Sequence, residues 1–246
     1  MRGRWISLAL LGLVGACDGE QPWLAAEDIQ VVNRVLVCDG SARAGQSTGV
    51  CTQDTRLAAF TELVHACEVG ERCVLHEIWV GASYGSADVR PPAVFEPANV
   101  KAQEGRQAVE AAMRARRAAV TEDSLPSTPA TVVTSDIAGA LARAGDLGVD
   151  GSRASLLIAT DGALIIPGCP GINFETRVAS FDALRACLEG REEQANLSMF
   201  DEVVFCGITG EGRTQPETRA MRSTLSSLVV HAGGVKPTFR LRCPEP

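Results

Sequence analysis

Short apolar runs alternate with amphipathic runs along most of the chain, which is the pattern of an α/β fold. The predicted strands cover Val31–Cys38, Cys73–Val80, Arg90–Phe95, Ser155–Thr160, Asp201–Ile208 and Lys236–Cys243. The predicted helices cover Thr55–Cys67, Gln103–Val120, Asp136–Ala144, Ser180 (as the cap) through Leu188, and Pro216–His231. Strands that alternate with helices predict a doubly wound, mainly parallel sheet with helices on both faces.

Two of the predicted strands have distinct characters. Val31–Cys38 reads as apolar on both faces, as buried parallel strands are. Arg90–Phe95 contains two prolines, which sheets tolerate at an edge. We therefore expect the first strand to be buried and the second to lie at an edge of the sheet.

The first 28 residues differ from this pattern. Met1–Arg4 is basic, Trp5–Val14 is apolar, and small residues precede Cys17, which predicts a secretory signal peptide over residues 1–16. Leu13–Cys17 resembles a bacterial lipobox, which implies cleavage before Cys17 and lipid on its sulfur; the alternative is an ordinary signal peptide with a chance cysteine. A polar tether over residues 17–28 then leads to the folded domain, residues 29–246.

Cysteine usage agrees with export. The chain has nine cysteines, and assigning Cys17 to lipid leaves eight, an even set that predicts disulfides in an oxidising compartment, the periplasm or the cell surface. Eight cysteines allow 105 pairings, so the sequence alone does not give the connectivity. The alternative is that several are buried free thiols.

The net charge disfavours some partners. It is −7 for the whole chain, and removal of Arg2 and Arg4 with the signal peptide leaves 21 basic against 30 acidic groups, hence −9. Such a surface is not expected to bind nucleic acid or anionic lipid through charge. Attachment to a membrane would therefore come from the lipid anchor.

Three separated segments carry oxygen ligands. Val35–Arg43 and Leu156–Gly162 are strands that each end on an aspartate, Asp39 and Asp161, and Val132–Leu141 places Ser135 at the start of a helix. In an open α/β sheet, strand ends and helix starts of this kind converge at the crevice where ligands bind. These residues are thus a candidate site.

The spacing resembles the metal-ion-dependent adhesion site of von Willebrand factor A domains. Asp39-Gly40-Ser41-Ala42-Arg43 resembles the first family motif, Ser135–Leu141 the second with Ser for Thr, and Thr160-Asp161-Gly162 the third. Leu225–Gly234 is similar to the last helix of the family and its Gly-Gly exit. The resemblance implies a binding module and not an enzyme: a magnesium-type ion on Asp39, Ser41, Ser135 and Asp161 would bind a carboxylate of a protein partner.

Arg43 departs from the motif, because the family has a serine there. A guanidinium has only donors and cannot bind a cation, and like unit charges 4 Å apart repel by about 4 kcal/mol at an effective dielectric of 20. Two arrangements stay open. Either Arg43 points away and four side chains with water hold the ion, or Arg43 pairs with Asp39 and Asp161 in a metal-free domain.

The resemblance also orders the cysteines. In this fold the strands before Cys206 and Cys243 are parallel neighbours, so these two are expected to form a disulfide, with Cα atoms about 5.5 Å apart. Three further expected bridges span local loops: Cys67–Cys73, Cys169–Cys187 and Cys38–Cys51, the last beside Asp39.

Two other functions remain as alternatives. A hydrolase would use Cys206 as the nucleophile and His76 as the base, which requires a free thiol at Cys206. A disulfide-linked structural lipoprotein without a ligand is the second alternative.

Overall fold

The computed structural model describes residues 30–41, 50–65, 71–80, 87–95, 135–147, 153–166, 168–169, 171–174, 177–192, 194–209 and 212–244, with residues 107, 111, 114, 115 and 118. Six strands form one sheet in this part of the chain. They are β1 (Gln30–Cys38), β2 (Glu71–Trp79), β3 (Asp88–Phe95), β4 (Arg153–Ala159), β5 (Glu202–Cys206) and β6 (Thr238–Arg240).

The strand order is β3-β2-β1-β4-β5-β6. All neighbours are parallel except β2 and β3, which are antiparallel. The chain moves outward from β1 to β3 and then returns to place β4 on the free side of β1, so the order reverses between β1 and β4. The expected mainly parallel sheet is confirmed, and the proline-containing strand lies at its edge.

Four helices in the described ranges connect these strands: α1 (Gln53–His65), α3 (Ile137–Gly145), α4 (Phe181–Leu188) and α5 (Gln215–His231). Their first residues follow local capping rules. Ser180 accepts a hydrogen bond from the Ala183 amide, as the sequence predicts, and Thr214 forms a reciprocal capping box with Glu217. Asp136 caps α3 through the Gly139 amide at 2.9 Å.

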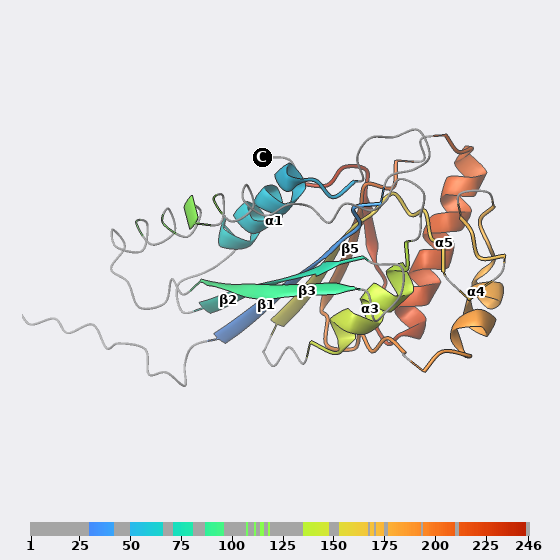
Figure 1. The fold of residues 1–246 in the computed structure, drawn as a ribbon, viewed down its shortest axis with the longest axis horizontal. Helices are drawn as coiled ribbons and strands as arrows, with labels where there is room; N and C mark the ends of the chain where they lie inside the picture. Colours follow the sequence, from blue (N-terminus) through green and yellow to red (C-terminus); the bar gives the residue numbers. More distant parts are fainter. Residues whose placement is uncertain are drawn as a thin grey trace, which may run out of the picture.

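The sheet has separate cores on its two faces, because alternate strand residues point in opposite directions. On one face, Val35 of β1 packs in a cluster with Leu141 of α3 and Leu225 of α5. On the other, Leu36 packs in a smaller cluster with Phe60 of α1. We call these the α5 face and the α1 face; Figure 1 shows α1 on one side of the sheet and α3 and α5 on the other.

Some predicted elements differ in extent. The strand expected over Lys236–Cys243 is limited to Thr238–Arg240, and β1 carries Asn33 and Arg34 within a run that the sequence analysis took as apolar on both faces. The loop expected over Gly162–Asn173 makes isolated bridges from Ile165 to Ser135 and Asn173. Most of the helix expected over Gln103–Val120 lies outside the described residues, and its five described positions are helical.

Three of the four expected disulfides are present. The Cα–Cα distances are 5.3 Å for Cys38–Cys51, 5.8 Å for Cys169–Cys187 and 4.7 Å for Cys206–Cys243. Cys73 is also disulfide-bonded, whereas Cys67 lies outside the described residues. Disulfides are typical of proteins in oxidising, extracytoplasmic compartments. Among the helices described, none is long and apolar enough to cross a membrane.

Candidate functional site

The candidate site lies at the carboxyl ends of β1 and β4, where the strand order reverses. Cys38 and Ala159 are paired as the last residues of these strands, and the Asp39 amide donates to the Ala159 carbonyl at 2.9 Å. The Thr160 amide extends the same edge by donating to the Cys206 carbonyl at 3.0 Å. The expectation that these two strands lie side by side is confirmed.

Asp39 is the centre of this site. Its Oδ1 accepts hydrogen bonds from the Ser41 hydroxyl at 2.6 Å and from the Ser41 amide at 3.0 Å. Its Oδ2 accepts hydrogen bonds from the hydroxyls of Ser135 and Thr160, both at 2.8 Å. Three segments separated by up to 121 residues thus meet on one carboxylate. Asp39 is only 2% exposed, so these hydroxyls replace the water that would otherwise solvate it.

Burial dominates the electrostatics of Asp39. Removal from water raises the pKa of the Asp39 carboxyl above its ordinary value, and the negative charge of Asp161 raises it further. The three hydroxyl donors lower this pKa but do not offset the burial. The site therefore contains a carboxylate whose charge would be stabilised by a nearby positive group.

Asp161 lies on the rim of the site and is half-buried. Its Oδ1 accepts a hydrogen bond from the Ala163 amide at 2.7 Å, which fixes the turn after β4. Gly162 in this turn has a φ of +78°, and a Cβ there would lie 2.7 Å from the Met221 sulfur. Glycine at position 162 is thus required by both backbone conformation and packing.

The loop after β1 rests on an aromatic side chain. A Cβ on Gly40 would lie 3.2 Å from the Trp79 ring, and the Arg56 guanidinium lies over the same ring, 5.1 Å from its centroid. The Cys38–Cys51 disulfide closes the loop, and the Cys51 amide donates to the Asp39 carbonyl at 3.2 Å. These contacts hold the Asp39–Ser41 turn at the strand end.

Two residues of the site were missed by sequence reasoning. Thr160 was counted only as part of the Thr-Asp-Gly motif, although its hydroxyl binds Asp39. Arg191, in the turn after α4, forms a bidentate pair with the fully buried Asp136 at 2.8 and 3.1 Å, next to Ser135. No local sequence signal identifies Arg191, because its partner is 55 residues away.

The role of Asp39, Ser41, Ser135 and Asp161 as metal ligands stays a prediction. The structure places the hydroxyls of Ser41 and Ser135 on the Asp39 carboxylate, and the charge of Asp161 acts on the same carboxylate. Together with Thr160 we call this group the Asp39 crevice. Arg43, which decides between the two predicted arrangements, lies outside the described residues. The described part of the chain has no group of three or more His, Cys, Asp or Glu side chains placed to hold a metal. The oxygen atoms around Asp39 come mainly from hydroxyls.

The hydrolase alternative does not match the geometry. Cys206 is bonded to Cys243, so its sulfur is not a thiolate. His76 belongs to β2, and the two strands β1 and β4 lie between it and β5. The His76 ring nitrogen Nε2 is 3.1 Å from Asn33 Oδ1, and burial lowers the pKa of this histidine.

Comparison with known proteins does not assign this chain to a family. The chain matches no protein-family model and no curated protein sequence.

Proposed function

We propose that this chain is an exported, lipid-anchored binding module that binds a protein partner through the Asp39 crevice. The observation that carries the proposal is the convergence of two strand ends and one helix start on the Asp39 carboxylate. Such a position, at the reversal of the strand order, is where open α/β sheets bind ligands.

The proposed fold type is the doubly wound arrangement of von Willebrand factor A domains. Two features support it: the reversal between β1 and β4, and helices packed against both faces of the sheet. The antiparallel edge strand β3 fits the order of elements that the resemblance implies.

The side chains of the crevice fit a divalent cation such as Mg²⁺. All five offer oxygen, the ligand type that Mg²⁺ prefers. Each hydroxyl that donates its hydrogen to Asp39 keeps lone pairs for a second contact. A cation would also offset the repulsion between Asp39 and Asp161 and the cost of burying Asp39. Residues Ser41, Ser135 and Asp39 or Asp161 would hold the ion, which would supply an open position for a carboxylate of the partner.

Export and anchoring complete the proposal. The three described disulfides agree with an oxidising compartment, and lipid on Cys17 would hold the chain at the membrane. The net charge of −7 argues against nucleic acid as the partner. Cys17→Ser is expected to move the chain from the membrane fraction to the soluble fraction or to leave it unprocessed.

The cation is tested by isothermal titration calorimetry with MgCl₂. The parent protein is expected to bind one ion, and Asp161→Ala is expected to abolish the signal because it removes a rim carboxylate. Asp182→Ala, at a position where the side chain is 85% exposed in α4, is the matched control and should bind like the parent.

Arg43→Ser separates the two arrangements of the crevice. If Arg43 points away from the crevice, the variant binds Mg²⁺ as the parent does. If the parent gives no signal and Arg43→Ser binds the ion, the natural crevice is the metal-free form with Arg43 as its cation. Absence of binding in both proteins would contradict the cation site.

A further inference from the structure

Ser135 reaches Asp39 from the start of α3, and the neighbouring Asp136 fixes that start. The Asp136 side chain is fully buried. Its Oδ1 accepts hydrogen bonds from the Gly139 amide at 2.9 Å and from Arg191 Nη1 at 3.1 Å, and its Oδ2 accepts one from Arg191 Nη2 at 2.8 Å. A buried carboxylate is stable only with such partners. Asp136 thus connects the start of α3 to the turn after α4, 55 residues further along the chain.

The geometry of the Arg191–Asp136 pair restricts where Ser135 can lie. Two parallel N–H···O bonds fix the direction of a carboxylate as well as its distance. The Asp136 side chain is therefore held in one orientation relative to the turn after α4. Ser135 is the adjacent residue, and its hydroxyl lies 2.8 Å from Asp39 Oδ2. A displacement of Ser135 by about 1 Å is enough to break this hydrogen bond.

A disulfide connects the same two parts of the molecule on the other side of Ser135. The Ser135 carbonyl accepts a hydrogen bond at 3.1 Å from the amide of Ile165, in the loop after β4. This loop also contains Cys169, which is bonded to Cys187 of α4. Ser135 is thus attached to α4 along two paths, one through the loop and the disulfide and one through Arg191.

Thr160 reaches the same carboxylate oxygen by another route. Its hydroxyl also donates to Asp39 Oδ2 at 2.8 Å, and Thr160, like Ser135, is fully buried. Thr160 directly follows β4, and its amide donates to the carbonyl of Cys206 in β5 at 3.0 Å. The sheet therefore holds Thr160, whereas the start of α3 holds Ser135. The two donors allow a comparison within one site.

We infer that Arg191 is a positioning residue of the Asp39 crevice: by holding Asp136, it keeps the Ser135 hydroxyl on Asp39. Its effect on binding rests on the function proposed above, because Ser135 is one of the residues that would hold the cation. Arg191 acts through Asp136 and not by contact with the ion. Substitution of residues that orient metal ligands lowers metal affinity by about 10- to 100-fold.

NMR of hydroxyl protons in metal-free buffer tests the positioning. The buried, hydrogen-bonded protons of Ser135 and Thr160 are expected to give two signals, which Ser135→Ala and Thr160→Val assign. In Arg191→Met, the Ser135 signal should be lost and the Thr160 signal should remain, because the sheet holds Thr160. Arg185→Met, which replaces a 44% exposed arginine of α4, is the matched control and should keep both signals.

A second variant separates positioning from the effect of an unpaired buried charge. Arg191→Met removes the cation beside Asp136, whereas the double variant Asp136→Asn, Arg191→Met removes both charges, and asparagine can still cap α3. The double variant should also lose the Ser135 signal and keep that of Thr160. A Ser135 signal that stays in either variant would overturn the inference, as would loss of both signals in the double variant.

Calorimetry with MgCl₂ relates the positioning to the proposed cation. Arg191→Met should weaken Mg²⁺ binding by about 10- to 100-fold. In Ser135→Ala, the further change Arg191→Met should have no effect, because both act through the same hydroxyl. If the parent binds no Mg²⁺, the proposed cation site fails, while the hydroxyl signals still decide the positioning. Unchanged Mg²⁺ affinity in Arg191→Met after loss of the Ser135 signal would overturn the role of Arg191 in binding.

Discussion

The two faces of the sheet use alternate residues of the same strands, yet they differ in how they are stabilised. Among the described residues, the cluster on the α5 face has 27 buried members and that on the α1 face has 11. Four of those 11 are cysteines, and the α1 face also holds the buried Arg56–Glu77 pair. Apolar burial is therefore the larger part of what stabilises the α5 face, and covalent and ionic contacts take a larger share on the α1 face.

The difference shows how a face of the sheet with few buried apolar residues can still be stabilised. Helices α3 and α5 supply large aliphatic side chains such as Leu141, Met221 and Leu225 to one face, whereas the described side chains that α1 buries are mainly Ala58, Ala59 and Phe60. Disulfides stabilise such a region by restricting the unfolded chain, without requiring more apolar surface. The two faces should consequently respond differently to substitution.

The largest effect is expected from breaking the buried ion pair on the α1 face. Arg56 and Glu77 are 1% and 2% exposed and 2.9 Å apart. Glu77→Gln leaves the arginine charge uncompensated and should lower the free energy of unfolding by about 3–5 kcal/mol, measured by urea denaturation. The double variant Arg56→Met, Glu77→Leu should recover most of this loss, since apolar pairs of similar volume often replace buried ion pairs. A double variant as unstable as Glu77→Gln would show that the charge is not the cause.

A smaller loss is expected from removing one disulfide on each face. Replacing Cys206 and Cys243 by Ser should cost about 2–4 kcal/mol in urea denaturation. The two cysteines of the Cys169–Cys187 pair on the α5 face are 18 residues apart, and those of the Cys206–Cys243 pair are 37 apart. By loop entropy alone, removing the Cys169–Cys187 disulfide should therefore cost about 0.6 kcal/mol less. We expect a larger difference, because the α1 face has less apolar burial. A greater loss on the α5 face would contradict the comparison.

The pH dependence of stability should report the titration of Asp39, the carboxylate that directly follows β1. The pKa of Asp39 is raised in the folded chain, so the folded state holds the proton more tightly than the unfolded state. The stability that Asp39 contributes is present below pH 3.8, the ordinary pKa of its carboxyl, and is lost as the pH rises through the raised pKa of the folded state. In metal-free buffer, Asp39→Asn should flatten this part of a plot of Tm against pH. An unchanged profile would exclude Asp39 as the titrating group. Asp182→Asn, which replaces an exposed aspartate of α4, is the control and should leave the profile as in the parent.

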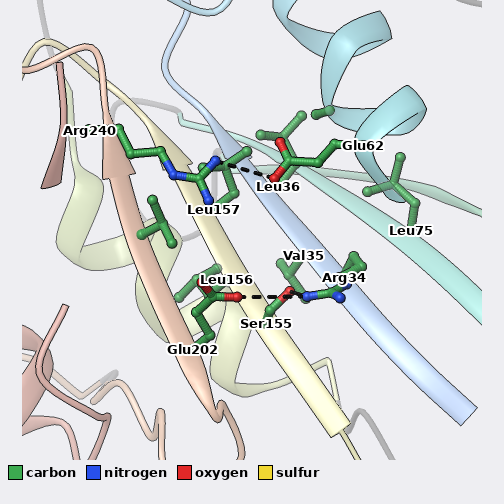
Figure 2. A pocket seen from close by; sticks show the side chains of 12 residues that line it. Arg34, Val35, Leu36, Glu62, Leu75, Ser155, Leu156, Leu157, Glu202 and Arg240 are labelled. Carbon is green, nitrogen blue, oxygen red and sulfur yellow. Dashed lines mark hydrogen bonds and ion pairs between the residues drawn. The ribbon is translucent and has the colours of Figure 1, made fainter. Parts of the chain in front are cut away.

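The smallest effect is expected at an exposed ion pair. Glu62 of α1 and Arg240 of β6 are 51% and 46% exposed, and Figure 2 shows this pair over the α1 face. Because solvent screens such pairs, Glu62→Gln should change the free energy of unfolding by less than about 1 kcal/mol, measured as above. A loss comparable to that of Glu77→Gln would mean that the exposed pair also stabilises the α1 face.

Local patterns in the sequence predict most of the elements and one edge of the site. Apolar periodicity places the strands, and the position of Ser180 predicts the start of α4 to the residue. Aspartates that directly follow two strands indicate that Asp39 and Asp161 share the carboxyl edge of the sheet. The ends of β6 were less predictable, because its pairing with β5 covers only three residues.

The sequence alone therefore determined the elements, the mainly parallel sheet and the strand ends that form the Asp39 crevice, since each depends on residues close together in the chain. Only the tertiary structure decided which side chains meet: Thr160 on Asp39, Arg191 on Asp136, and Arg56 on Glu77. These partners are 121, 55 and 21 residues apart. Their contacts depend on how strands and helices pack in three dimensions, and no periodicity within a single element encodes them.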